Sequence, residues 1–215
     1  TTGWSTGTLS TFWTTQSSYT IIVRSQDSAG NYSTSYASAS FTYDTDLPTS
    51  WVVSPSSLVI VGMNSVTGTA SDEGNGVVND VKVAVKRLTG DATTWMASDG
   101  TFSINQIAPN WLNNSSFAGG VWSLTTLNTS KLTGGASYFV MSRAIDDVAN
   151  EEGSGNGNQG TSPPRTSTFT YDVDLPTAVL TSPVHLTYLK SGNLSPIMGT
   201  AADWVRTGAL ANNVQ

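Results

Sequence analysis

The chain has 215 residues, of which 38% are hydrophobic and 11% charged, and its formal net charge is −6. This acidity argues against nucleic acid as a partner, because phosphates need a basic surface to displace their counterions. The hydrophobic content exceeds that of a typical disordered chain, and no apolar run reaches the length of a membrane span.

In chain order, the sequence predicts strands at residues 19–24, 38–44, 81–86, 138–143 and 167–172. The first and fourth are apolar at successive positions, which is typical of inner strands. In 81–86 every second residue is valine, which predicts a strand with one buried face and Ala84 on the other. Gly, Asn and Asp clusters indicate turns, and no stretch has a sustained helical period, so we predict an all-β fold.

A repeat organises the chain. FTYDTDLPT at 41–49 returns as FTYDVDLPT at 169–177, and SYTIIVRSQDSAGN at 18–31 aligns with SYFVMSRAIDDVAN at 137–150. Downstream, GTASD at 68–72 returns as GTAAD at 199–203. We therefore interpret 47–174 as one complete unit, 1–46 as the C-terminal part of a preceding unit, and 175–215 as the N-terminal part of the next.

The partial units can be completed in two ways. The tail half of one molecule could complete the head half of the next by strand exchange and so build a filament. Such a composite unit would lack counterparts of residues 85–118. The sequence therefore favours a segment of a much longer repeat chain over a split subunit.

Leu132 stands six residues before Tyr138 with a Gly-containing turn between them, as in the tyrosine corner of immunoglobulin-like and fibronectin-like sandwiches. With DSAGN at 27–31 and the order of the repeated motifs, the chain resembles the bacterial Ig-like repeats of giant surface proteins and adhesins. DDVAN at 146–150 departs from that hairpin motif at its Gly. The resemblance implies tandem β-sandwiches, one complete and two partial, and concerns scaffold rather than activity.

In such a sandwich the incoming linker and two loops share one end, and here that end collects acidic and amide side chains. The candidate metal ligands are Asp44, Asp46, Asp72, Glu73, Asp146, Asp147 and Asn150, with Asp172, Asp174 and Asp203 beginning the next junction; Glu151 and Glu152 belong to the same acidic group. Gathered carboxylates repel one another unless a cation neutralises them, and calcium takes six to eight oxygen ligands. We expect Ca²⁺ to stiffen each junction; the alternative is a set of solvated turn residues.

Other chemistry has weaker support. Trp95 and Trp111 lie in the inserted stretch 88–118 and could form an aromatic platform for a sugar. His185 is the only histidine and cysteine is absent, so no nucleophile–base pair is evident and we predict no enzyme activity.

The absence of cysteine favours an exported bacterial protein. We expect an extracellular segment at the bacterial cell surface that serves as a stalk, surface fibre, filament or adhesin shaft. Its expected partners are neighbouring repeats, other copies in a filament, and a glycan or host-surface ligand. The alternative is a carbohydrate-binding module of a secreted protein.

Overall fold

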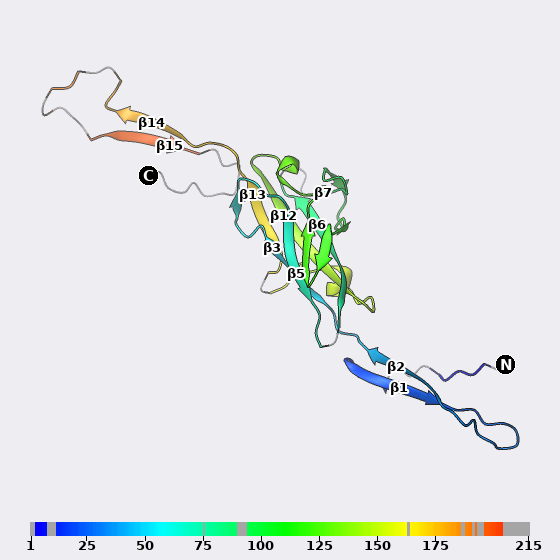
Figure 1. Cartoon of the computed structure of the whole chain (residues 1–215). Coiled ribbons are helices and arrows are strands. Elements are labelled where there is room, and N and C mark those ends of the chain that lie inside the picture. The colour runs from blue at the N-terminus through cyan, green and yellow to red at the C-terminus, as the bar shows by residue number, and fades with distance from the viewer. Residues whose placement is uncertain are drawn as a thin grey trace.

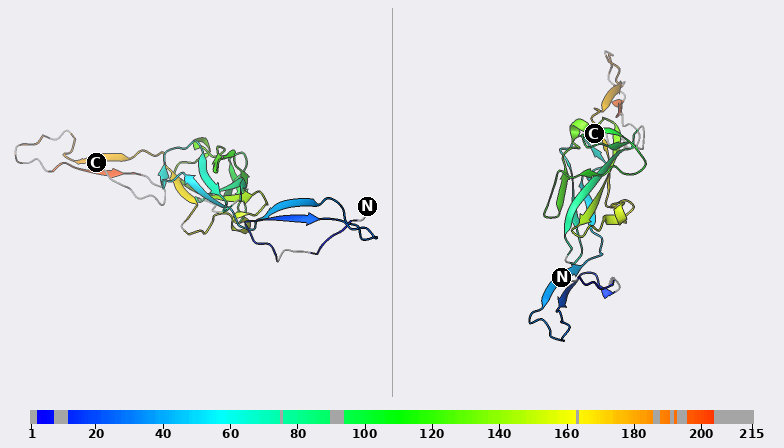
Figure 2. Two further views of the ribbon diagram at one scale, coloured as in Figure 1. Left: turned by 60° about the horizontal axis from the view of Figure 1, so that its bottom comes forward. Right: turned by 90° about the vertical axis from the view of Figure 1, so that its right-hand side faces the viewer.

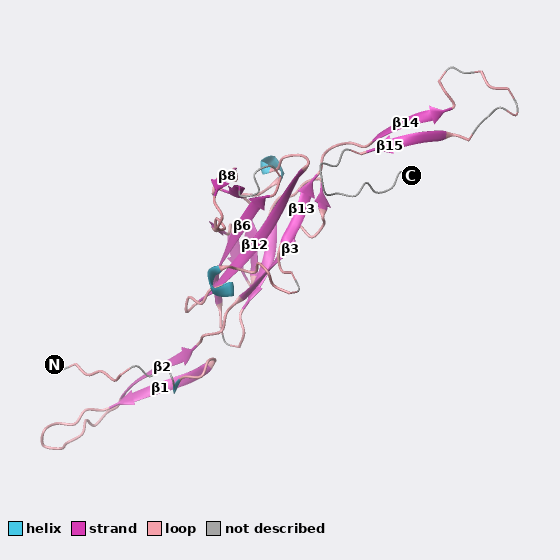
Figure 3. Ribbon diagram, turned by 180° about the vertical axis from the view of Figure 1, so that it is seen from behind, coloured by secondary structure: helices cyan, strands magenta, loops and turns pink. Residues whose placement is uncertain are grey.

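The computed structural model describes residues 3–7, 12–74, 76–89, 94–162, 164–185, 188–190, 192 and 196–203. These residues form β-strands joined by turns, loops and short 3-10 segments, which Figure 3 draws in the helix colour. There is no α-helix among them. The predicted all-β fold class is confirmed. Accordingly, this part of the chain contains no helix with the length and hydropathy needed to cross a membrane.

Within the described residues the strands pair into four sheets, two in the central part and one near each end. In chain order they are β1 (Ser17–Val23), β2 (Ala37–Tyr43), β3 (Thr49–Ser54), β4 (Val59–Ile60), β5 (Val66–Ser71), β6 (Val78–Arg87), β7 (Thr94–Met96), β8 (Phe102–Asn105), β9 (Leu112–Asn113), β10 (Ser116–Ala118), β11 (Val121–Leu124), β12 (Ala136–Asp146), β13 (Ser167–Tyr171), β14 (Thr177–Ser182) and β15 (Met198–Ala202). Among the described residues, short 3-10 segments cover Thr129–Lys131 and Glu152–Gly155.

The two central sheets form a sandwich. One has the order β10-β11-β5-β3 and the other β4-β13-β12-β6-β7-β8, with β9 also paired to β6. One core cluster draws on both sheets, from Val66 and Trp122 in the first to Val83, Tyr138 and Phe169 in the second. These residues occupy alternate positions along their strands, so each sheet turns one side toward the common core.

The inserted stretch folds back over the outside of β6 and β12 rather than extending into solvent. Ala84 and Met141 point away from the main core, yet both are buried beneath Trp95, with Trp111 and Phe139 packed around them. The expectation that β6 has one open face is therefore wrong at Ala84. The reason is that β7, β8 and β9 pair beyond β6 and add a second, smaller apolar cluster.

The terminal hairpins repeat strand pairs of the sandwich. β1–β2 has the register of β12–β13: Tyr19 lies opposite Phe41 as Tyr138 lies opposite Phe169. β14–β15 has the register of β3–β5, and the register shift after Val52 recurs after Leu180. Each hairpin therefore corresponds to two neighbouring strands of one sheet of the sandwich. Figures 1 and 2 show the two hairpins leaving opposite ends of the central sandwich.

The hydrogen bond expected for a tyrosine corner is present in both copies. The backbone N–H of Thr133 donates to the hydroxyl of Tyr138 at 2.8 Å, and that of Thr14 donates to the hydroxyl of Tyr19 at 2.7 Å. The same local geometry thus forms in the complete unit and in the partial unit before it.

Candidate metal centre

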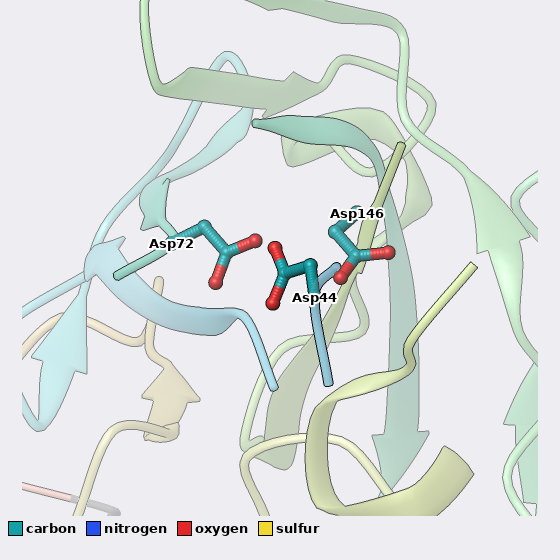
Figure 4. Close-up of side chains that lie close together, drawn as sticks. All are labelled: Asp44, Asp72 and Asp146. Atoms are coloured by element: carbon teal, nitrogen blue, oxygen red, sulfur yellow. The ribbon is translucent and has the colours of Figure 1, made fainter. Parts of the chain in front are cut away.

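Three aspartates from three separate segments meet where the β1–β2 hairpin joins the central sandwich. Asp44 follows β2, Asp72 follows β5, and Asp146 ends β12. Each offers a carboxylate oxygen, and these oxygens lie within 4.8 Å of one another (Figure 4). Asp44 and Asp72 are half-buried and Asp146 is buried.

Backbone N–H groups donate to Oδ1 of each of the three carboxylates. Oδ1 of Asp44 accepts from the backbone N–H of Asp46 at 2.9 Å, and Oδ1 of Asp72 accepts from Glu73 N at 2.9 Å. Oδ1 of Asp146 accepts the backbone N–H groups of Val148 and Asn150 at 3.0 and 2.7 Å. Within the described residues, Oδ2 of Asp72 is buried and has no hydrogen-bond partner.

The charge at this site is not balanced by a basic side chain. None of the ion pairs found in the described part of the chain includes these three aspartates. Burial, together with the charges of Asp44, Asp146 and Asp46, raises the pKa of Asp72 above its ordinary value, although its bond from Glu73 N opposes the rise. Ionising Asp72 therefore costs more here than in water, and a bound cation would offset that cost.

Asn150 and Asp46 support the site from the side. The Asn150 amide donates to Oδ2 of Asp146 at 2.8 Å and to the backbone carbonyl of Asp46 at 3.1 Å. Asn150 thereby ties the linker to the loop after β12. Glu73 and Asp147, also predicted as ligands, are exposed and stand outside the triad.

Two residues that sequence reasoning missed shape the same site. Gln16 donates from Nε2 to Asp44 Oδ1 and to Asp46 Oδ2, both at 3.1 Å, so the first hairpin also holds the linker. Gly76 leaves the space next to the carboxylate of Asp72, where a Cβ would collide with it. Gly76 belongs to the sequence Gly-Asn-Gly at 74–76, which is typical of a turn and could have drawn attention to it. Nothing in the sequence indicated a role for Gln16.

Glu151 and Glu152 do not join the acidic group, contrary to the expectation. Glu151 pairs with Arg143 at 3.0 Å, whereas Glu152 turns inward, is 2% exposed, and pairs with Arg165 at 3.1 Å. Oε1 of Glu152 also accepts from Ser50 N at 2.9 Å, and Oε2 accepts from Ala144 N at 3.1 Å. The loop after β12 therefore sends one carboxylate into the sandwich instead of toward the junction.

A chain of side-chain hydrogen bonds leads to Glu152. The Asn158 amide donates to Ser142 Oγ at 2.8 Å, Ser142 and Ser50 bond through their hydroxyls at 2.8 Å, and Ser50 Oγ donates to Glu152. Because Ser50 donates to Glu152, Ser142 donates to Ser50, and each hydroxyl both accepts one hydrogen bond and donates one along this path. Burial raises the pKa of Glu152, and the donors from Ser50, Ala144 and Arg165 oppose that rise.

The next junction starts with the same residues in the same local geometry. The backbone N–H of Asp174 donates to Asp172 Oδ1 at 3.0 Å, as Asp46 does to Asp44. Oδ1 of Asp203, the match of Asp72, is buried without a hydrogen-bond partner among the described residues. Before the first junction, Asp27 accepts from Asn31 as Asp146 accepts from Asn150.

The aromatic platform predicted from Trp95 and Trp111 is not formed. Trp95 is 3% exposed, with Lys86 over its ring at 5.2 Å and its Nε1 donating to Gln106 O. Trp111 is half-buried beneath Arg143, whose guanidinium lies 4.7 Å from the ring centre. Their faces are used in packing because the inserted stretch folds back onto β6 and β12.

Comparison of the chain with protein-family models, with curated proteins and with solved structures returned no significant match. The interpretation of the acidic junction therefore rests on its own geometry and on the internal repeat.

Proposed function

We propose that the chain is a segment of an extracellular bacterial repeat protein, in which tandem Ig-like sandwiches joined end to end form a stalk, surface fibre or filament. The observation that carries this proposal is the recurrence of one bonding scheme along an extended molecule. The tyrosine hydroxyl contact, the Asp–Asn turn and both hairpin registers occur twice. Tandem units add length while each keeps its own core.

We further propose that a calcium ion belongs to each junction. Asp44, Asp72 and Asp146 together offer three carboxylates from the linker and two loops, and water can supply the remaining oxygens of a six- to eight-ligand shell. A cation there would bind the linker to the sandwich and fix the angle between successive units. It would also relieve the repulsion that makes ionised Asp72 unfavourable.

Titration of the chelated chain with CaCl₂, followed by calorimetry and thermal unfolding, tests the cation. We expect binding at roughly 0.1–1 mM, as in extracellular calcium modules. At the tighter end of that range, about 10 mM Ca²⁺ should raise Tm by roughly 5–10 °C. Asp72→Asn should abolish the response, while Glu73→Gln, one residue away and outside the triad, should keep it. Absence of both heat and a Tm shift in the unsubstituted chain would refute the cation.

The gene sequence on either side of this segment tests whether the chain belongs to a fibre of tandem repeats. Further copies of the FTYD-x-DLPT junction and of the tyrosine-corner motif are expected in both directions. A neighbouring catalytic domain with no further repeats would instead favour a module of a secreted enzyme.

A further inference from the structure

The first strand of the central sandwich, β3, lies at the edge of its sheet, next to β5. An edge strand turns alternate backbone N–H and C=O groups away from its neighbour, and these groups need other partners. At Ser50 the loop between β12 and β13 supplies both partners with side chains. The backbone N–H of Ser50 donates to Glu152 Oε1 at 2.9 Å, and its carbonyl accepts from the Asn158 amide at 3.2 Å. Ser50 is therefore held from two sides, by β5 and by this loop.

Ser50 also stands where the linker enters the sandwich. The linker residue Asp44 belongs to the aspartate triad, and Pro48 restricts the backbone between it and Ser50. Thr49, at the start of β3, lies opposite Ser71, the residue before Asp72. The seat of β3 therefore sets how the linker approaches the other two aspartates.

The loop that holds Ser50 begins at the candidate cation site. Asp146, which ends β12, is one of the triad, and the Asn150 amide donates to the linker carbonyls of Asp44 and Asp46 at 3.5 and 3.1 Å. The loop 146–158 thus grips the incoming chain at two places, at the carbonyls before β3 and at Ser50 within β3.

Backbone hydrogen bonds join these two grips. Ile145 and Glu151 pair in an antiparallel bridge, and the backbone N–H of Asp146 donates to the carbonyl of Asn150 at 3.1 Å. Glu152 follows Glu151 directly and is 2% exposed. A displacement of Glu152 is therefore transmitted through bonded backbone to Asn150 and Asp146.

We propose that the loop 146–158 is a clasp on the linker and that Glu152 is a positioning residue of the cation site, an inference that rests on the proposed function. The hydrogen bonds and the ion pair of the Glu152 carboxylate within the described chain go to Ser50, Ala144 and Arg165, and none goes to the aspartate triad. Glu152 therefore acts on the site through Ser50 and the loop. Binding of the cation and closing of the clasp then stabilise each other, and this coupling is reciprocal.

Calcium titration by calorimetry, at a temperature where circular dichroism shows each chain to be folded, tests the role of Glu152. We expect Glu152→Gln to weaken Ca²⁺ binding about fivefold or more, as is usual for coupled sites. Glu151→Gln, the matched control, removes the same charge one residue earlier and should leave the affinity within about twofold. Ser50→Ala keeps the backbone bond to Glu152 but removes the hydroxyl, so it should weaken binding by a smaller factor.

The control and the milder variant keep the test decisive. Equal weakening in Glu151→Gln and Glu152→Gln would reduce the effect to net charge and overturn the inference. If Glu152→Gln does not fold, Ser50→Ala carries the test, and an affinity equal to that of the unsubstituted chain would overturn the inference.

Amide hydrogen exchange in EDTA reads the clasp without the ion. The backbone N–H of Asp46 bonds to Asp44 Oδ1 within the linker, so its exchange reports how well the linker is held. It should exchange about fivefold or more faster in Glu152→Gln than in the unsubstituted chain, and unchanged in Glu151→Gln. Equal exchange in all three chains would show that Glu152 does not hold the linker.

The two measurements separate this inference from the proposed function. An unsubstituted chain that binds no Ca²⁺ would refute the cation and the role of Glu152 at its site together. Calcium binding that Glu152→Gln leaves unchanged would refute the role of Glu152 alone.

Discussion

Tyr138 and Tyr19 occupy matching positions in two copies of the repeated unit, but only Tyr138 lies in the core of a sandwich. Both hydroxyls accept a backbone N–H, from Thr133 and Thr14. Tyr138→Phe removes one hydrogen bond from the cooperative unit and should lower its free energy of unfolding by about 1 kcal/mol. Tyr19→Phe, the matched control, should change the main urea transition by less than about 0.3 kcal/mol. Equal losses in the two variants would contradict this.

Asp72 gives the junction a defined pH dependence when no cation is bound. Its pKa in the folded chain is raised, first by burial, so the folded state holds the proton more tightly than the unfolded state. The sign follows: this stabilising contribution is full below the ordinary pKa of Asp and is lost as pH rises through the folded pKa.

Asp72→Asn should remove the loss of stability that accompanies the ionisation of Asp72. In EDTA at pH 7 we expect its Tm to exceed that of the unsubstituted chain by roughly 1–3 °C, because relieving one half-exposed repulsion is worth less than about 1 kcal/mol. The difference should shrink as the pH is lowered, because Asp72 then takes up its proton and becomes neutral like Asn. Thermal unfolding by circular dichroism at several pH values measures it. A lower Tm for Asp72→Asn at pH 7 in EDTA would count against unfavourable ionisation.

Part of this site follows from sequence alone. Asp44, Asp72 and Asp146 are brought together by the order of strands, and the resemblance to Ig-like sandwiches implied that the segments carrying them share one end. Gln16 could not be predicted, because its contact depends on how the hairpin sits on the sandwich. Glu152 was misplaced because charge and nearness in sequence to Asp146 suggested solvent.

At the scale of elements, the loop between β12 and β13 carries the largest departure from expectation. The sequence feature that could have predicted it lies in other strands: Ser50 in β3 and Ser142 in β12 are polar residues at inward-facing positions, and both are buried. Two buried hydroxyls facing one another need a further acceptor, and Glu152 provides it. Similarly, the inserted stretch was expected to offer an aromatic platform, but its strands β7 and β8 use Trp95 and Ile104 to cover the outside of β6.

Glu152→Gln tests how firmly this loop closes the sandwich. Each carboxylate oxygen accepts two donors, so an amide NH₂ in either orientation faces two donors and loses both bonds. It also removes the negative charge that pairs with Arg165. We expect a loss of roughly 2–4 kcal/mol in the free energy of unfolding, measured in urea.

The matched control is the adjacent Glu151→Gln. The Glu151 side chain is more exposed and, within the described part of the chain, bonds the Arg143 guanidinium alone, so the loss in Glu151→Gln should stay below about 1 kcal/mol. Similar losses at the two positions would mean that the inward carboxylate adds no more to stability than a surface ion pair.

At the scale of the whole molecule, the proposed function depends on the angle between units being fixed. Side-chain amides contact the linker at the first junction from both sides: Gln16 reaches Asp44 and Asp46 from the hairpin, and Asn150 reaches the linker carbonyls from the sandwich. Both hold the linker by neutral amides, while three carboxylates around it repel one another. Without a cation, the attraction and the repulsion at the linker oppose each other.

Calcium should therefore narrow the range of angles between the first hairpin and the central sandwich. Because the chain has no cysteine, the substitutions Ser28→Cys and Ile107→Cys allow one spin label in the hairpin turn and one on the sandwich, where Ile107 is 93% exposed. The distance distribution from double electron–electron resonance should be broad in EDTA and narrow in Ca²⁺. A second pair, Val61→Cys with Ile107→Cys, lies within the sandwich and should give the same width in both. Asp146→Asn should keep the distance distribution of the hairpin pair broad in Ca²⁺. If the chain that retains Asp44, Asp72 and Asp146 gives the same width in EDTA and in Ca²⁺, the angle does not depend on the ion.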